Sequence, residues 1–166
     1  PYPIRVEQRI DSAAAYLLNA NLQEVVSRGT AKGLARYISP AHYLAGKTGT
    51  TNDLRDSWFA GFGNDLIGVV WLGRDDNKPS GFSGATGALK IWGRMMKKLR
   101  IEALTLNQPD NVKWFWVDSI NQKTLTGRCD NAEYLPYIKG TQPQNKGSCD
   151  ASHFSNDWLN RLFQTQ

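Results

Sequence analysis

The sequence predicts an α+β fold in which helices flank an antiparallel sheet and a small loop-rich segment follows. Three observations carry this prediction. A helical pattern near the N-terminus precedes three segments of strand-forming residues, and a second helical pattern comes after them. A short turn-forming segment joins two of the strand segments, which favours antiparallel pairing. After residue 104 the composition changes. We therefore expect two parts, residues 1–104 and residues 105–166.

Two segments have the apolar periodicity of helices that bury one side. The first begins at Asp11 or Ser12, which are both good N-caps, and runs to about Arg28. Gly29 is placed to end this helix at the C′ position. The second covers residues 88–99 and ends in basic residues, which suit the negative end of the helix dipole. Its apolar residues are expected on one side: Leu89, Trp92, Met95, Met96 and Leu99.

The chain between these helices is rich in aromatic and β-branched residues, which indicates strands. Residues 57–62 and 66–72 form two of them. Residues 63–65, Gly-Asn-Asp, suit a hairpin loop between the two. Residues 44–51 are expected to form a third strand.

The segment after residue 104 gives weaker signals. Residues 107–111 are typical of a linker, and residues 113–118 and 123–126 are expected to form a second small hairpin. Residues 139–152 are expected to be a loop. Residues 155–163 carry apolar pairs at helical spacing, so we expect a short closing helix there.

The two cysteines, Cys129 and Cys149, lie in this loop-rich segment. A disulfide between them would close a loop of about 20 residues and contribute roughly 3 kcal/mol. We expect this disulfide, and with it an oxidising compartment. The alternative is a pair of unrelated free thiols. A zinc site is not expected, because no CxxC motif or nearby pair of histidines accompanies the cysteines.

The bulk properties exclude several classes of function. The chain has 166 residues and a net charge of +5, but no run of Lys and Arg long enough to indicate a nucleic-acid partner. No apolar stretch reaches the ~18 residues of a membrane span. Nothing in the sequence calls for a cofactor or a metal ion. The chain starts without Met or a signal peptide, so we expect it to be part of something longer.

The segment most informative about chemistry is residues 45–51, Ala-Gly-Lys-Thr-Gly-Thr-Thr. It matches the end of a phosphate-binding loop, G-x-x-x-x-G-K-[ST], but the leading glycine is replaced by Ala41. The other interpretation is the Lys-Thr-Gly motif of penicillin-recognising serine enzymes. Glycines at 46 and 49 would let a peptide lie close against the strand and pair with it. Lys47 would place a positive charge beside that peptide, and Thr48 and Thr50 would face one side.

The neighbouring sequence strongly resembles class A penicillin-binding proteins of the bifunctional 1b type over about residues 12–100. The segments that carry the resemblance are Gly46 to Asn52, Asp56 to Gly61, Leu22 to Ala31, Trp71 to Asn77 and Ser83 to Ala88. The resemblance implies that residues 1–104 are the C-terminal portion of a transpeptidase domain and that residues 105–166 are an appendage. It also implies a parent protein with a glycosyltransferase activity, on the periplasmic side of the bacterial inner membrane.

This family cross-links peptidoglycan through an acyl-enzyme at the D-Ala-D-Ala bond, and β-lactams imitate the donor peptide. The resemblance assigns Lys47 to the neighbourhood of a serine in a separate S-x-N motif. It assigns binding of the substrate carboxylate to Thr48 and Thr50, and an oxyanion N–H to Thr50. Together with these residues, Gly49, Thr51 and Asn52 are the expected substrate-binding positions.

The chain departs from the family in two motifs. No serine is followed three residues later by lysine, so the nucleophile of the S-x-x-K motif is missing. The S-x-N match at residues 119–121 comes after the Lys-Thr-Gly motif instead of before it, and we discount it. Both motifs are expected N-terminal to residue 1, in the remainder of the same protein, and residues 1–166 alone should be inactive. Two alternatives remain: a D,D-carboxypeptidase or β-lactamase, and a non-catalytic module that binds peptidoglycan or a protein partner through residues 105–166.

Overall fold

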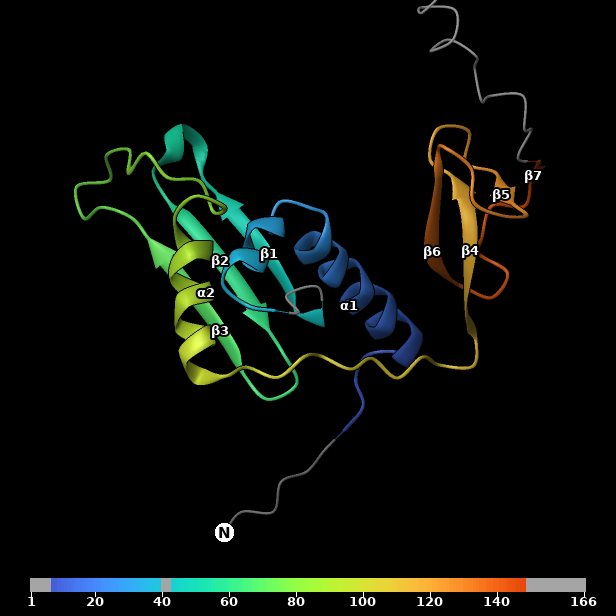
Figure 1. The fold of residues 1–166 in the computed structure, drawn as a ribbon, viewed down its shortest axis with the longest axis horizontal. Coiled ribbons are helices and arrows are strands. Elements are labelled where there is room, and N and C mark those ends of the chain that lie inside the picture. Colours follow the sequence, from blue (N-terminus) through green and yellow to red (C-terminus); the bar gives the residue numbers. More distant parts are fainter. Residues whose placement is uncertain (1–6, 40–42, 149–166) are drawn as a thin grey trace, which may run out of the picture. The chain divides into compact units, whose positions relative to one another are not determined.

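The computed structural model describes residues 7–39 and 43–148. The chain divides into two compact units, residues 1–109 and residues 110–166. Each unit has its own sheet, and the two sheets share no strand (Figure 1). The predicted helix at 155–163 lies outside the described residues.

The sheet of the first unit has three antiparallel strands in the order β1-β2-β3. They are β1 (Ala45–Thr50), β2 (Ser57–Phe62) and β3 (Ile67–Leu72). Each lies within one residue of the strand predicted from the sequence. Residues 63–66 connect β2 to β3, one residue more than predicted, and the N–H of Gly63 donates to the carbonyl of Leu66 at 2.9 Å. The α+β prediction is confirmed.

Helix α1 (Ser12–Ser27) begins as its capping signal predicts, because the carboxylate of Asp11 accepts a hydrogen bond from the N–H of Ala14 at 3.0 Å. Arg28 is the C-cap, and Gly29 follows it. A Cβ on Gly29 would come within 2.8 Å of the Cα of Val25. Glycine therefore ends this helix because the chain folds back closely against its last turn.

Helix α2 (Ala88–Leu99) has the predicted bounds, but its predicted apolar side is partly wrong. The buried residues are Ala88, Leu89, Trp92, Gly93 and Met96. Met95 and Leu99 are exposed in the described structure. Met95 lies at the margin of the stripe that faces the sheet, where a helical position turns away from the core, and Leu99 is the last residue of the helix, three residues beyond its last buried residue, Met96.

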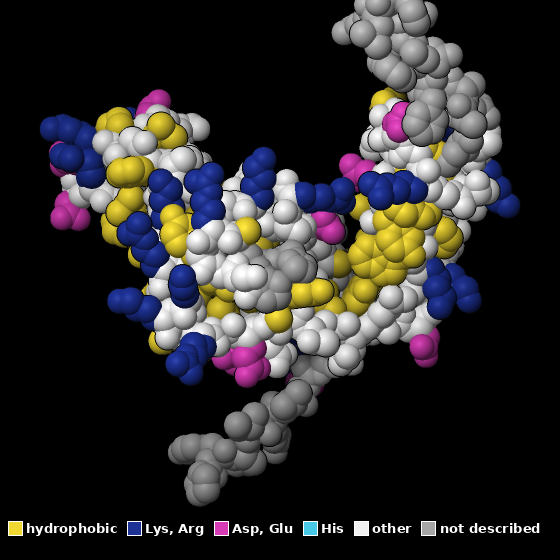
Figure 2. Space-filling model, in the orientation of Figure 1, with side chains coloured by type: hydrophobic (Ala, Val, Ile, Leu, Met, Phe, Trp, Pro, Cys, Tyr) yellow, Lys and Arg dark blue, Asp and Glu magenta, His cyan; other side chains and the backbone are white. Residues whose placement is uncertain are grey.

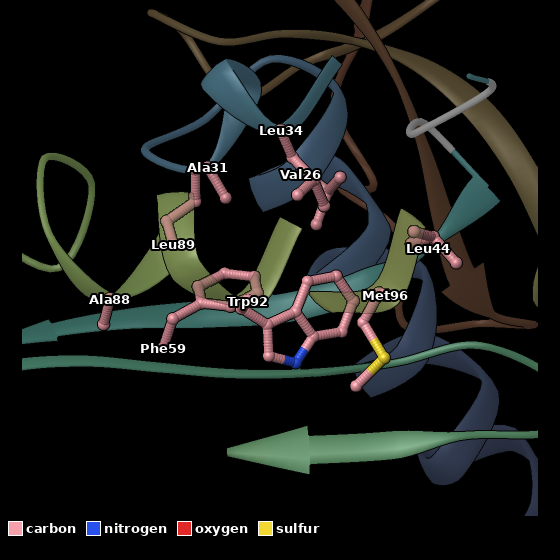
Figure 3. Packing of buried hydrophobic residues seen from close by; sticks show 9 residues of the cluster. All are labelled: Val26, Ala31, Leu34, Leu44, Phe59, Ala88, Leu89, Trp92 and Met96. Atoms are coloured by element: carbon pink, nitrogen blue, oxygen red, sulfur yellow. The ribbon is translucent and has the colours of Figure 1, made fainter. Parts of the chain in front are cut away.

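The core of the first unit lies between the two helices and one face of the sheet (Figure 3). Trp92 of α2 is fully buried and packs edge-to-face on Phe59 of β2, with ring centroids 5.1 Å apart. Its indole N–H donates to the carbonyl of Gly68 at 3.0 Å. A Cβ on Gly61 or Gly68 would come within 3.0 Å of the Trp92 side chain, so these strand glycines make room for the indole.

The opposite face of this sheet carries exposed apolar side chains. Register pairs Trp58 with Trp71, and their ring centroids are 6.2 Å apart. Ile67 and Val69 lie on the same face, and these four side chains are 43–77 % exposed. Both long helices of the first unit pack on the other face, so no described element of this unit covers the apolar face.

The second unit contains a four-stranded sheet in the order β6-β4-β5-β7. Its strands are β4 (Val112–Asp118), β5 (Thr124–Leu125), β6 (Ala132–Ile138) and β7 (Lys146–Gly147). The predicted hairpin of β4 and β5 is confirmed. The sequence did not predict β6 or β7, because Pro136 interrupts the strand pattern of β6. That proline is tolerated because β6 lies at the edge of the sheet.

The surface of the second unit carries hydrophobic side chains gathered over the β4–β6 pair (Figure 2). On one face of this pair Tyr134 contacts Trp114 and Trp116, with centroid distances of 5.3 and 4.9 Å.

Cys129 is disulfide-bonded. Cys149, its predicted partner, lies outside the described residues, so the pairing stays a prediction. No helix among the described residues is long and apolar enough to cross a membrane.

Candidate active site

The Lys-Thr-Gly motif forms β1, which is an edge strand of the three-stranded sheet. A phosphate-binding loop would require this segment to be a loop that leads into a long helix. Lys47 and Thr48 instead occupy the middle of an extended strand that leads through a short turn into β2. The phosphate-loop interpretation is therefore wrong, and the strand that the Lys-Thr-Gly interpretation requires is present.

The outer edge of β1 presents backbone groups that no described strand uses. The N–H of Thr51 donates to the carbonyl of Asp56 at 3.2 Å, on the side of β2. Successive N–H groups along a strand point to opposite sides, so those of Thr50 and Thr48 point away from β2. They are directed toward the open edge, where an extended peptide can pair as a further strand.

The side chains of the motif divide between the two faces of the sheet. Thr48 pairs with the buried Phe59 and Thr50 with the buried Ser57, so the two threonines share one face of the sheet, as predicted, and it is the helix-covered face. Lys47 lies on the opposite face and is exposed, and its Nζ donates to the carbonyl of Thr48 at 2.8 Å. The strand therefore presents hydroxyls on one side of the open edge and a cation on the other.

Thr48 has a hydroxyl partner far away in the sequence. The Oγ1 of Thr30, in the turn after α1, lies 2.7 Å from the Oγ1 of Thr48. This distance is typical of a hydrogen bond between two hydroxyls. The end of α1 therefore touches the Lys-Thr-Gly strand directly.

Thr50 is held by the loop before α2. Its Oγ1 accepts a hydrogen bond from the N–H of Gly84 at 2.9 Å. A Cβ on Gly84 would lie 2.6 Å from the carbonyl oxygens of both Gly49 and Trp58. Only glycine allows this loop to approach the strand so closely. Because the Thr50 oxygen accepts from Gly84, its hydroxyl proton remains available to donate to another group.

Ser57 of β2 holds the same loop through two side-chain hydrogen bonds. Its buried Oγ donates to the carbonyl of Ser83 and accepts from the N–H of Ala88, both at 2.8 Å. The N-cap of α2, Gly87, has no side chain that can satisfy a helix N–H. Ser57 does this from a different element, and it thereby ties the start of α2 to the end of the Lys-Thr-Gly strand.

Thr51 and Asp56 close the turn between β1 and β2. The Oγ1 of Thr51 donates to Oδ2 of Asp56 at 3.0 Å and accepts from the N–H of Asp56 at 2.8 Å. The indole N–H of Trp71 donates to Oδ1 of the same carboxylate at 2.9 Å. Asp56 thus links the turn between β1 and β2 to Trp71 of β3.

The turn itself, η3 (Asn52–Leu54), has an unusual backbone. Asp53 and Leu54 both adopt positive φ, at 58° and 53°, which is costly for residues with a Cβ. The carbonyl of Leu54 accepts hydrogen bonds from the N–H and the hydroxyl of Ser80 and from the N–H of Gly81. These three contacts hold the strained turn beside the predicted substrate position Asn52.

The loop after β3 contains an ion pair. Arg74 donates to both carboxylate oxygens of Asp76 at 2.9 Å, and this pairing holds the pKa of Asp76 well below its ordinary value.

In the second unit, three hydrogen bonds lower the pKa of Asp118. The largest contribution comes from the N–H of Asn121, and the side chain of Asn121 and the N–H of Ile120 add to it. The discounted Ser119–Asn121 match is thus part of a turn capped by Asp118. No metal-binding cluster of His, Cys, Asp or Glu occurs in the part of the chain that the structure describes.

Four residues around the motif were not predicted as site residues: Thr30, Ser57, Ser80 and Gly84. Thr30, Ser80 and Gly84 contact β1 or its turn from distant positions in the sequence, and Ser57, the register partner of Thr50, contacts the loop before α2. Local pattern carries no signal for such contacts. The repeated glycines and hydroxyl residues of the 83–87 segment were the only hint that this loop packs closely.

The chain has clear relatives among known proteins, although no family model matches it. Penicillin-binding protein 1B of Vibrio cholerae is 40 % identical over 160 residues, which cover 96 % of this chain and 20 % of the relative. Penicillin-binding protein 1B of Escherichia coli is 40 % identical over 115 residues, covering 69 % of this chain and 13 % of the relative.

Solved structures agree with these relatives. The crystal structure of penicillin-binding protein 1A from Haemophilus influenzae matches with a TM-score of 0.69 and 27 % identity, over 83 % of this chain and 22 % of that protein. The chain spans about a fifth of the length of the Vibrio relative. The resemblance noted from the sequence is confirmed, and the chain belongs to the class A penicillin-binding proteins of the 1B type, of which it represents a segment.

Proposed function

We propose that this chain forms the substrate-binding side of the active site of a D-Ala-D-Ala transpeptidase. One observation carries the proposal: the N–H groups of Thr48 and Thr50 face the open edge of β1, beside two hydroxyls and a lysine. A stem peptide lies against this edge as an additional strand. The N–H of Thr50 then donates to the oxygen of the scissile carbonyl as negative charge develops there.

The remaining roles follow from the chemistry of the side chains. The hydroxyl of Thr50 accepts from Gly84 and donates its proton to the terminal carboxylate of the donor peptide, and Thr48 donates to the same group. Lys47 leaves the Thr48 carbonyl and places its charge beside the reacting serine. Gly49 allows the peptide to approach, and Thr51 and Asn52 form the end of the site.

The nucleophilic serine comes from another part of the same protein. Its Oγ attacks the carbonyl of the D-Ala-D-Ala bond, the C–N bond breaks, and D-Ala leaves with the proton of the serine hydroxyl. An amine of a neighbouring stem peptide then attacks the acyl-enzyme ester, forms the new peptide bond and returns a proton to the serine oxygen. The uncovered apolar face with Trp58, Val69 and Trp71 supports this arrangement, because an apolar face of a sheet is normally covered by further structure. The rest of the protein is the partner that covers it.

The partners and location proposed here follow from the same relatives. The ligands are peptidoglycan stem peptides and β-lactams, and the site faces the periplasm. A disulfide between Cys129 and Cys149 fits that compartment. The names of the relatives do not favour the alternative of a non-catalytic binding module.

The test is fluorescent-penicillin labelling of the full-length protein that contains this sequence, read after denaturing electrophoresis. The unmodified protein should be labelled, and residues 1–166 alone should not. Lys47→Ala should slow labelling roughly 10- to 100-fold, because a charge-assisted contact is lost. Lys98→Ala removes an exposed lysine at the end of α2 and should leave the rate unchanged. Labelling of residues 1–166 alone, or equal rates for the two variants, would refute the proposal.

A further inference from the structure

The turn after α1 brings a hydroxyl to the Lys-Thr-Gly strand that neither the sequence pattern nor the proposed mechanism uses. Thr30 is exposed, and its Oγ1 lies 2.7 Å from that of Thr48. Eighteen residues separate the two threonines in the sequence. An exposed hydrogen bond between neutral groups contributes little to folding, so stability alone gives no strong reason for this contact.

The position of Thr30 is built by its neighbours. The N–H of Gly29 donates to the carbonyl of Glu24, and the N–H of Ala31 donates to that of Val25, both at 3.0 Å. Ala31 is fully buried in the core. Thr30 therefore stands between two anchored residues, and its side chain is held beside β1 by the last turn of α1.

The chemistry of hydroxyl groups decides which member of this pair donates the hydrogen bond. Each hydroxyl has one proton to donate and two lone pairs that accept. When Thr48 donates its proton to a ligand, its oxygen can only accept from Thr30. A donor that also accepts a hydrogen bond is polarised and becomes a stronger donor. Thr30 thus fixes where the Thr48 proton points and strengthens the hydrogen bond that it makes.

We propose that Thr30 is a positioning residue for carboxylate recognition, which acts by donating a hydrogen bond to Thr48. This inference rests on the proposed function, since it assumes that Thr48 contacts the terminal carboxylate of the ligand. Thr30 itself touches neither the ligand nor the reacting atoms. Its contribution should therefore depend on the presence of a carboxylate on the ligand.

The test compares acylation of the full-length protein by benzylpenicillin and by its uncharged methyl ester. Thr30→Val keeps the shape of the side chain and removes the hydroxyl, and Thr30→Ser keeps the hydroxyl. Loss of one neutral hydrogen bond corresponds to about a five-fold change. We expect Thr30→Val to lower the acylation rate constant about five-fold for the acid, with little change for the ester. Thr30→Ser should restore the rate for the acid.

Two further variants separate positioning from a general structural effect. Ser27→Ala removes an exposed hydroxyl from the last turn of α1 that bonds only within its own helix, and it should not change either rate. Thr30→Val should add no further loss in a Thr48→Val background, because the two hydroxyls act through one contact. Thr30→Ala provides the same test if the valine variant does not fold.

The outcomes distinguish the inference from the function on which it rests. If the unmodified protein is acylated but Thr30→Val reacts with the acid at the unmodified rate, the inference is wrong and the proposed function stands. Equal losses for acid and ester would also overturn it, because a carboxylate-independent loss is a structural effect. If the unmodified protein is not acylated at all, both fall.

Discussion

Gly84 offers the sharpest test of how the loop before α2 shapes the site. In Gly84→Ala, the new Cβ would lie 2.6 Å from the carbonyl oxygens of Gly49 and Trp58 and 2.9 Å from the nitrogen of Gly49. All three atoms belong to the backbone of paired strands, so none can swing aside as a flexible side chain could. The loop must move away from β1, and the hydrogen bond from Gly84 to Thr50 must lengthen or break.

The size of the effect follows from these contacts. Overpacking of a rigid site costs about 1–3 kcal/mol, and the lost hydrogen bond adds about 1 kcal/mol. A loss of about 2–4 kcal/mol lowers the melting temperature of a domain of 150–250 residues by roughly 5 to 15 °C. Acylation by fluorescent penicillin should slow as well, because Thr50 loses the contact that orients its hydroxyl.

The matched control is Gly33→Ala in the 3-10 helix η1 (Lys32–Arg36) of the same unit. The nearest atom to its new Cβ would be Cδ2 of Leu89 at 3.9 Å, an ordinary contact. This variant should melt at or slightly above the temperature of the unmodified protein and should be acylated normally. If Gly84→Ala behaved like Gly33→Ala in both assays, the close approach of the loop to β1 would be refuted.

Three further predictions concern other contacts of the two units. Ser57→Ala leaves the N–H of Ala88 and the carbonyl of Ser83 without their buried partner, so calorimetry should show a loss of about 2–4 kcal/mol, whereas Ser27→Ala should show almost none. The pKa of Asp118 is lowered in the folded protein, so its stabilisation is present above the pKa of an unfolded Asp and is lost as the pH falls. The difference in melting temperature between the unmodified protein and Asp118→Ala should therefore be largest near neutral pH and shrink toward pH 3; a constant difference would contradict this. Thiol titration should find no free cysteine before reduction and two after it, and two free thiols in the unreduced protein would exclude a disulfide between Cys129 and Cys149.

Local pattern was sufficient for the elements whose burial repeats with a simple period. The three strands of the first unit and the bounds of α2 were predictable because aromatic and β-branched runs end at clear turns or caps. Met95 was misplaced because it lies at the edge of the apolar stripe, and Leu99 because it follows the last buried residue of the helix; at both positions only the neighbouring elements decide burial. Strand β6 was missed because Pro136 reads as a break, and sequence does not reveal that the strand lies at a sheet edge.

The site divides in the same way. Lys47 to Thr50 were recognisable because the motif is contiguous and its glycines have a clear purpose in a strand that receives a peptide. Thr30, Ser57 and Gly84 were not recognisable, because each acts through a contact that only the folded chain creates. The motif thus indicates the chemistry of the site, and hydroxyls and backbone groups from distant parts of the sequence hold the motif in position.

The paired indoles of Trp58 and Trp71 also make the molecule its own optical reporter. Trp58 lies opposite Gly49 in the register, and Trp71 shares the Asp56 carboxylate with Thr51. Both rings are partly exposed in the first unit, whereas Trp92 is fully enclosed by the core. Docking of the rest of the protein on the face that carries them should therefore shift the emission of the two outer indoles while that of Trp92 stays constant. Association of the two parts of the transpeptidase can then be followed by intrinsic fluorescence, without a dye.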